Sequence, residues 1–215
     1  MIDDEVRYKK MMLPYVRLMD HVEDFSLVMK RVDEILEHSD LPIVEVGTRA
    51  GGSALCFMDL VHRREKKNWV YTIDPYGAIS WSSKEGVTLE KSSYVNRYYQ
   101  QAMVEISTMA FMNELNHHHF KCTSKEFVEW VYPNFRQYDN EKNCVLTNFC
   151  FVYLDGDHGF ETVSMELDFF LPRITKGGCV IVDDTQHTIE QLDEYCENRY
   201  KVTHMNKRSM VENYD

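Results

Sequence analysis

One stretch determines the predicted fold class of this chain: Pro42-Ile43-Val44-Glu45-Val46-Gly47-Thr48-Arg49-Ala50-Gly51-Gly52-Ser53. Its first five residues form a short, largely β-branched run that is typical of a buried strand, and Gly47 ends that run. The glycines that follow allow a sharp turn, and residues 54–61 then form an apolar run of helical character. The stretch therefore predicts a strand, a glycine loop and a helix in succession.

Strands and helices continue to alternate on both sides of this stretch. Apolar residues recur at helical spacing over 25–36 and again over 160–171. The strands are continuously apolar, which indicates burial on both faces and a mostly parallel sheet. We therefore predict a doubly wound α/β domain of three layers, with helices on both faces of the sheet. Further strands are predicted over 69–74, 148–154 and 179–182, with a short strand over 119–122 and a closing strand or hairpin over 200–214. Further helices are predicted over 96–116, 127–131 and 187–198.

The remaining segments are predicted to be irregular. Residues 1–20 are Met-rich, and we expect them to form an arm or a short helix that precedes a domain over 21–215. Residues 78–95 and 134–147 are polar and are predicted to be loops. Gly177-Gly178 is expected to break the chain before the last apolar run.

Net charge and cysteine content narrow the classes of function. Lys and Arg number 24 and Asp and Glu 35, and the resulting charge of −11 disfavours a nucleic-acid-binding surface. The six cysteines form no C-x-x-C pair, which argues against a zinc ribbon or a disulfide framework and favours a reducing compartment. The first residues lack a signal-peptide pattern, and no apolar run approaches the ~20 residues that span a bilayer. We expect a soluble, cytoplasmic protein with no membrane partner.

Acidic residues stand at the ends of the predicted strands. Glu45 lies inside the first strand, Asp74 and Asp155 terminate two others, and Asp183-Asp184 terminates the last. Ligands of doubly wound sheets bind beyond the carboxyl ends of the strands. These carboxylates are therefore expected to converge on one edge of the sheet.

The glycine loop and Asp74 together favour a nucleoside ligand. Glycines permit close approach of the backbone to a ligand, and the helix after them presents free N–H groups. A strand-end aspartate can accept hydrogen bonds from ribose hydroxyls. The spacing of Gly47 and Gly51 departs from the G-x-G-x-x-G pattern of dinucleotide sites, and a purely structural turn is the alternative.

Leu154-Asp155-Gly156-Asp157-His158 and Val182-Asp183-Asp184 suggest a divalent metal ion. Clustered carboxylates repel one another unless a cation is present, and Mg²⁺, Ca²⁺ and Mn²⁺ prefer oxygen ligands. The alternative for Asp183 is to cap the following helix. We interpret the consecutive histidines His117-His118-His119 as the solvated end of a secondary-structure element. A group of aromatic residues is predicted to lie either in the core or along a substrate pocket: Trp81, Tyr94, Tyr98 and Tyr99.

These motifs resemble the class I S-adenosylmethionine-dependent methyltransferases, most closely the macrocin or sugar O-methyltransferase-like subgroup, which is similar to catechol-type O-methyltransferases. The resemblance covers about residues 42–190 and implies a Rossmann-like methyltransferase fold. It implies that Asp74 holds the ribose and that Ser124 lies near the adenine. It also implies a metal set of Asp155, Asp183 and Asp184. Further residues implied to bind the cofactor are Glu45, Gly47, Thr48, Gly51, Ser53 and Asp155; Asp157 is implied as the general base, with His158 as the alternative.

The resemblance implies methyl transfer from S-adenosylmethionine to a hydroxyl of a small acceptor, a sugar or a polyphenol, with Mg²⁺ lowering the pKa of that hydroxyl. Two other interpretations remain open at this point. Asp155-Gly156-Asp157 also fits the D-x-D of a metal-dependent glycosyltransferase. Alternatively, the chain is a non-catalytic protein of methyltransferase fold that binds the cofactor or a partner. Met11, Met12 and Met19 suggest a homodimer contact.

Overall fold

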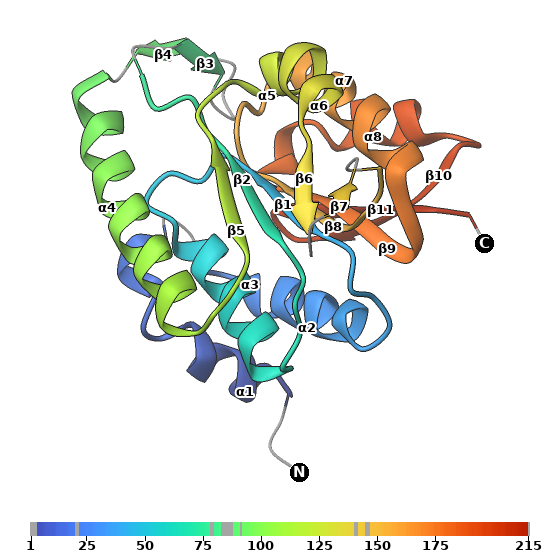
Figure 1. The fold of residues 1–215 in the computed structure, drawn as a ribbon. Coiled ribbons are helices and arrows are strands. Elements are labelled where there is room, and N and C mark those ends of the chain that lie inside the picture. Colours follow the sequence, from blue (N-terminus) through green and yellow to red (C-terminus); the bar gives the residue numbers. More distant parts are fainter. Residues whose placement is uncertain are drawn as a thin grey trace.

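The computed structural model describes residues 4–19, 22–77, 80–82, 88–90, 92–139, 142–144 and 147–214. Its centre is a seven-stranded sheet of order β10-β11-β9-β8-β1-β2-β5 (Figure 1). Every pairing from β9 to β5 is parallel, while β11 pairs antiparallel with both β9 and β10. The strands are β1 (Ile43–Val46), β2 (Val70–Ile73), β5 (His117–Phe120), β8 (Phe149–Leu154), β9 (Ile174–Val182), β10 (Tyr200–Met205) and β11 (Arg208–Asn213). The predicted doubly wound α/β fold is confirmed.

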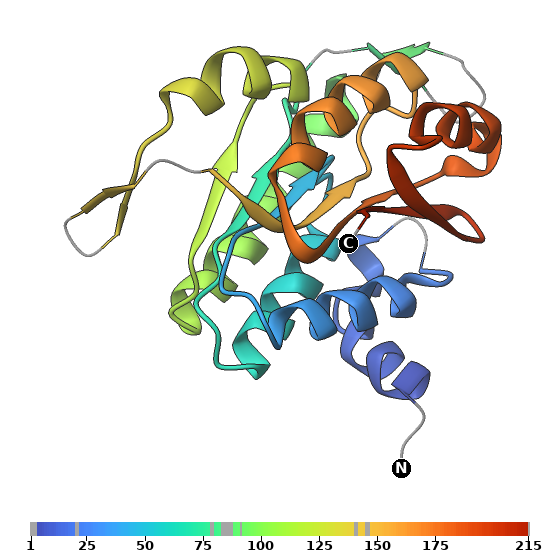
Figure 2. The same cartoon turned by 90° about the vertical axis from the view of Figure 1, so that its right-hand side faces the viewer.

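Helices cover both faces of this sheet (Figures 1 and 2). Side chains of β1 and β8 point alternately to two apolar clusters, so that Ile43 and Phe151 belong to one and Val44 and Val152 to the other. This is why the strands read as continuous apolar runs. The first cluster contains residues of α1 (Asp4–Met12), η1 (Val16–Leu18), α2 (Phe25–Leu36), α3 (Gly52–Arg63) and α4 (Ser92–Met112). The second contains residues of η2 (Phe127–Val131), α7 (Phe160–Phe170), η3 (Leu171–Arg173) and α8 (Ile189–Cys196). Along the chain, η2 follows α5 (Ser124–Glu126) and precedes α6 (Tyr132–Asn134).

The amino-terminal segment forms a helix, one of its two expected forms, and does not stand apart as an arm. Tyr8, Met11, Met12 and Leu18 are buried in the first apolar cluster. The hydroxyl of Tyr8 also donates to Asp33 of α2 at 2.7 Å. Residues before and after position 20 therefore share one core. Since Met11 and Met12 are buried within the chain, they do not form the predicted dimer surface, and the homodimer itself stays a prediction.

Strand β9 corrects the expectation that Gly177-Gly178 breaks the chain, because the strand runs through both glycines. Gly177 has a φ of +79°, and the pairing with β8 shifts register there, from Phe149 opposite Ile174 to Phe151 opposite Cys179. A Cβ at Gly178 would overlap the backbone carbonyl of Cys150. The glycine pair thus forms a bulge that keeps β9 against β8.

Two predicted loops contain short strand pairs. In the segment 134–147, β6 (Gln137–Asp139) pairs with β7 (Lys142–Cys144). In the segment 78–95, β3 (Ser80–Ser82) pairs with β4 (Thr88–Glu90), and α4 already begins at Ser92. The rest of that segment, and the side chains of Trp81 and Tyr94, lie outside the described residues.

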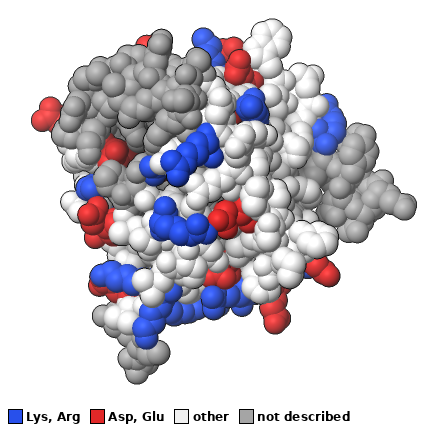
Figure 3. Space-filling view, turned by 90° about the vertical axis from the view of Figure 1, so that its left-hand side faces the viewer, with Lys and Arg blue, Asp and Glu red and all other residues white. Residues whose placement is uncertain are grey.

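Arg63-Arg64-Glu65-Lys66-Lys67 is a basic stretch of the sequence, and acidic side chains lie close to it in the structure. Arg63 pairs with Asp59 at 2.9 Å, and Lys66 pairs with Asp40 at 2.9 Å. On the face drawn in Figure 3, Lys and Arg lie among Asp and Glu, and several Lys and Arg side chains lie side by side along its lower part. No helix in the described part of the chain has the length and apolar content needed to cross a bilayer.

Candidate functional site

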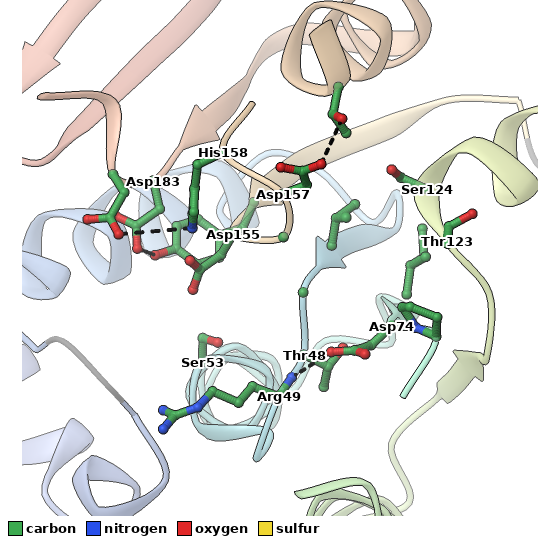
Figure 4. Close-up of a pocket in the computed structure, with 18 of the residues that line it drawn as sticks. Thr48, Arg49, Ser53, Asp74, Thr123, Ser124, Asp155, Asp157, His158 and Asp183 are labelled. Atoms are coloured by element: carbon green, nitrogen blue, oxygen red, sulfur yellow. Dashed lines mark hydrogen bonds and ion pairs between the residues drawn. The ribbon is translucent and has the colours of Figure 1, made fainter. Parts of the chain in front are cut away.

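A pocket of about 620 Å³ opens at the carboxyl ends of β1, β2, β8 and β9. This is the edge at which the acidic strand ends were predicted to converge. Of the site residues predicted from sequence, Glu45 and Gly51 do not line the pocket. The others line it: Gly47, Thr48, Ser53, Asp74, Ser124, Asp155, Asp157, His158, Asp183 and Asp184 (Figure 4).

The loop after β1 is shaped by Gly47. Its φ is +87°, and a Cβ at this position would overlap the carbonyl of Asp155. Only glycine permits this approach of the two strand ends without strain. Gly51, with a φ of +84°, instead packs against Ile106 and Ala102 of α4 and so fixes the start of α3.

Asp74, directly after β2, fixes this loop by accepting backbone hydrogen bonds. Its Oδ2 accepts the backbone N–H of Arg49 at 2.9 Å, and its Oδ1 accepts that of Tyr76 at 3.0 Å. Burial raises the pKa of Asp74, while these backbone donors act in the opposite direction. A carboxylate has about four lone-pair positions, so Asp74 keeps capacity for ligand hydroxyls at the pocket surface.

Glu45 lies beneath the loop and reaches the pocket through Ser53. The Ser53 hydroxyl donates a hydrogen bond to Oε1 of Glu45, and Ser53 lines the pocket. Burial raises the pKa of Glu45 to about 8, so the side chain is protonated at pH 7. A positive charge in the pocket would favour the ionised form of this buried acid.

On the opposite wall, Ser124 begins a helical turn that Thr123 caps. The Thr123 hydroxyl accepts the N–H of Glu126 at 3.1 Å, and the Glu126 carboxylate accepts the N–H of Thr123 at 2.9 Å. Behind Ser124 lies Glu166 of α7, which is buried. Burial raises the pKa of Glu166 to about 8, against a hydrogen bond from Ser124 that lowers it.

The two candidate bases after β8 have different surroundings. Asp157 turns toward α7, where its Oδ1 accepts the N–H of Gly159 and its Oδ2 accepts the hydroxyl of Thr162, each at 3.0 Å (Figure 4). It thus stabilises the start of α7. His158 extends toward the end of β9, and its Nε2 lies 3.9 Å from Oδ2 of Asp184.

The predicted metal set of Asp155, Asp183 and Asp184 is not assembled as a ligand cluster. Asp183 faces Arg208 of β11, with Nε 2.9 Å from Oδ1, and its Oδ2 accepts the hydroxyl of Tyr153 at 2.9 Å. In the described part of the chain, no group of three or more His, Cys, Asp or Glu side chains is arranged to hold a metal ion. Oδ1 of Asp183 accepts no hydrogen bond, so this carboxylate is held by the Arg208 ion pair and by Tyr153. In this arrangement the three residues form no Mg²⁺ site, and the ion itself stays a prediction.

A scan against family models identifies the domain: residues 44–185, more than half of the chain, match the model described as a methyltransferase domain. The chain belongs to this methyltransferase family. The expectation of a class I S-adenosylmethionine-dependent methyltransferase with a Rossmann-like fold is thereby confirmed.

Solved structures share the fold of this methyltransferase at low sequence identity. CalS11, a calicheamicin methyltransferase, superposes with a TM-score of 0.59 and 15% identity, over 99% of this chain and 92% of that one. PaMTH1 of Podospora anserina, bound to S-adenosylhomocysteine, gives 0.54 and 11%, over 100% and 89% of the two chains. MycE, in complex with Mg, S-adenosylhomocysteine and mycinamycin VI, gives 0.58 and 12%, over 96% and 54%. A search of curated proteins finds no match.

The methyltransferase pocket also uses residues outside the predicted site set. Leu18 and Met19 of the amino-terminal segment line it, together with Phe25 at the start of α2. Tyr98, predicted to lie either in the core or along a substrate pocket, lines the pocket under the guanidinium of Arg49, whose Cζ lies 4.7 Å from the ring centroid. The Met-rich composition of residues 1–20 was the available signal, since methionine-rich segments favour apolar packing surfaces.

The three consecutive histidines lie in the edge strand β5. The Nε2 atom of His117 and the Nδ1 atom of His119 both lie 2.9 Å from the hydroxyl oxygen of Thr72, while His118 points to the other face. Burial lowers the pKa of His117 and of His119 to about 4. The expected solvated end is thus wrong for these two side chains, which are partly buried and neutral at pH 7.

Proposed function

We propose that this chain is an O-methyltransferase that transfers the methyl group of S-adenosylmethionine to a hydroxyl of a small acceptor, a sugar or a polyphenol. One observation carries the proposal. A single pocket brings the glycine loop and Asp74 together with His158 and Asp184, so the wall that we propose to bind the nucleoside faces the proposed base.

The residues fit this cofactor by their chemistry. Asp74 keeps acceptor capacity for ribose hydroxyls, and Gly47 lets the glycine loop lie against the backbone of Asp155, where a Cβ would collide. Buried Glu45, linked through Ser53, supplies an acid close to where a positively charged ligand group would bind. A volume of about 620 Å³ falls in the range of small-molecule sites.

His158 is the base that this geometry favours. S-adenosylmethionine, when bound, supplies a methyl group whose bond to a positively charged sulfur breaks as an acceptor oxygen attacks it. His158 accepts the proton of that hydroxyl on a ring nitrogen, and the Asp184 carboxylate, 3.9 Å from Nε2, lies within ion-pair distance of the imidazole. Asp157 is less suited to this role because both of its oxygens are engaged at the start of α7. The pocket walls hold the acceptor in line, which lowers the entropic part of the barrier.

The proposal does not include the Mg²⁺ ion predicted from the sequence. Asp183 is already engaged by Arg208 and Tyr153, so no step is derived through a metal. The same geometry weakens the glycosyltransferase interpretation, since Asp157 of Asp155-Gly156-Asp157 is directed toward Thr162.

Titration calorimetry with S-adenosylhomocysteine tests the cofactor class. We expect one site per chain with a dissociation constant in the micromolar range, about −8 kcal/mol. Asp74→Asn is expected to weaken binding about tenfold or more, because it replaces charge-assisted hydrogen bonds by neutral ones. Asp40→Asn is the matched control, since the Asp40 side chain is 77% exposed and far from the pocket. Absence of binding in the unmodified chain would refute the proposal.

An acceptor screen then tests the reaction. Radiolabelled S-adenosylmethionine is incubated with hydroxylated sugars and catechols, and methylated product is counted. Product with any of them supports O-methyl transfer. Tight cofactor binding without turnover across the panel would instead favour the non-catalytic interpretation.

A further inference from the structure

We propose that Arg208 is the permanent counter-cation of the acidic strand ends, so that this site operates without a bound divalent metal ion. The inference deepens the proposed function and rests on it for the identity of the reaction. A buried arginine lies beside the carboxylates for which the sequence predicts a metal ion.

The Arg208 guanidinium occupies the cation position next to Asp183. Its Nε lies 2.9 Å from Oδ1 of Asp183, and one terminal nitrogen donates to Oδ2 at 3.3 Å. The hydroxyl of Tyr153 donates to the same Oδ2 at 2.9 Å, and Nε of Arg208 also lies 3.2 Å from that hydroxyl. Oδ2 of Asp183 therefore accepts hydrogen bonds from Tyr153 and Arg208, while Oδ1 accepts none and is balanced by the ion pair with the guanidinium.

This arginine is fixed in place from several sides. Its side chain is 1% exposed, and that of Asp183 is 6% exposed. The second terminal nitrogen donates to the carbonyl of Glu23 at 2.6 Å, and the guanidinium carbon lies 5.5 Å from the ring centroid of Phe25. The neighbouring residue, Ser209, pairs with Val182 in the sheet. A metal ion on Asp183 would have to move a buried cation away from its partners, which is costly.

The guanidinium also supplies the positive charge that a cluster of carboxylates needs to remain ionised. The positive charge of Arg208 acts on Asp155 as well as on Asp183, its direct ion-pair partner. Arginine stays charged at every working pH, so this compensation does not depend on the supply of an ion. Activation of the acceptor hydroxyl is then left to His158, which accepts the proton, with Asp184 as its ion-pair partner.

Metal binding to the unmodified chain of 215 residues tests this inference apart from activity. Mn²⁺ is titrated into the protein, with and without S-adenosylhomocysteine, and free Mn²⁺ is measured by electron paramagnetic resonance. For the unmodified chain we expect no stoichiometric site with a dissociation constant below about 1 mM. One Mn²⁺ per chain bound at micromolar concentration would overturn the inference.

Arg208→Met tests whether the arginine is responsible. Removal of the cation leaves Asp155 and Asp183 uncompensated, and we expect the affinity for Mn²⁺ to rise at least about tenfold, which is about 1.4 kcal/mol. Arg199→Met is the matched control, because it removes the same charge from a side chain that is 49% exposed. Equal affinities in the two variants would show that Arg208 is not the counter-cation.

Two further measurements keep the outcome unambiguous. If Arg208→Met fails to fold, Arg208→Lys retains the charge and is expected to bind Mn²⁺ as weakly as the unmodified chain; tight binding there would count against the inference. Titration of the same samples with S-adenosylhomocysteine reports on the proposed function separately. A chain that binds both S-adenosylhomocysteine and Mn²⁺ refutes only the inference, whereas one that binds neither refutes the proposed function.

Discussion

Ser53 at the start of α3 donates a hydrogen bond to the buried carboxyl of Glu45 in β1. The pair connects the pocket surface to an acid whose pKa burial raises to about 8. At pH 7 Glu45 therefore carries a proton in the ligand-free chain. A positively charged ligand group near Ser53 favours the ionised form of Glu45 and lowers its pKa.

Cofactor binding is therefore expected to release protons, up to about one per chain at pH 7. Calorimetric titration with S-adenosylmethionine in phosphate and in Tris measures this release, because the two buffers differ in ionisation enthalpy. Glu45→Gln removes the ionisable group and should abolish the buffer dependence. An equal dependence in both proteins would place the titrating group elsewhere.

Glu166 is expected to make the stability of the chain depend on pH. Its folded pKa, about 8, lies above its ordinary value of 4.5, so the folded state retains a proton that the unfolded state loses. The free energy of unfolding should then fall as the pH rises from about 5 to about 8, with a slope of at most about 1.4 kcal/mol per pH unit from this residue.

Urea denaturation between pH 5 and pH 9 checks this slope. Glu166→Gln should flatten the dependence without abolishing it, because Glu45 contributes in the same direction. Glu161→Gln, at an exposed position one turn earlier in α7, is the control and should leave the slope unchanged. If both variants behave like the unmodified chain, Glu166 is not protonated in the folded state.

Alanine substitutions at Gly47 and Gly177 together test the close contact between the loop after β1 and Asp155. Both have positive φ, +87° and +79°, but a Cβ at Gly47 would overlap the Asp155 carbonyl, whereas a Cβ at Gly177 meets nothing within 4 Å. Gly177→Ala is expected to cost only the backbone strain, about 1–2 kcal/mol. Gly47→Ala adds a steric clash and is expected to cost more than about 3 kcal/mol. Urea denaturation measures both, and equal losses would contradict the proposed close contact.

The fold was predictable because its signals are local. Each parallel strand is buried on both faces and is therefore continuously apolar, as Phe149–Leu154 shows. The gathering of acidic residues followed from topology alone, since parallel strands end at one edge. Strand β9 was harder to predict, because the need for Gly178 arises from the backbone of Cys150, more than twenty residues away.

The site was predictable as a set of positions but not as a set of contacts. Arg208 was missed because a single arginine in the carboxyl-terminal hairpin forms no motif, and its relation to Asp183 exists only when β11 pairs with β9. The place of Asp157 at the start of α7, by contrast, could have been predicted from the sequence. It stands three residues before the start of α7, with Thr162 in the first turn of that helix, a pattern typical of side-chain capping.

His158 and Asp157 can be separated by their substitutions. If His158 is the base, His158→Ala should reduce kcat by about 10²–10⁴-fold, with little change in the affinity for S-adenosylhomocysteine. Asp157→Asn retains an oxygen that accepts the N–H of Gly159, and its main expected effect is a loss of stability of about 1 kcal/mol through the start of α7. Single-turnover rates with a methyl acceptor and thermal melting distinguish the two outcomes. A large loss of turnover in Asp157→Asn at unchanged stability, with His158→Ala active, would assign the base to Asp157 and show that the hydrogen bonds to Gly159 and Thr162 break when the acceptor binds.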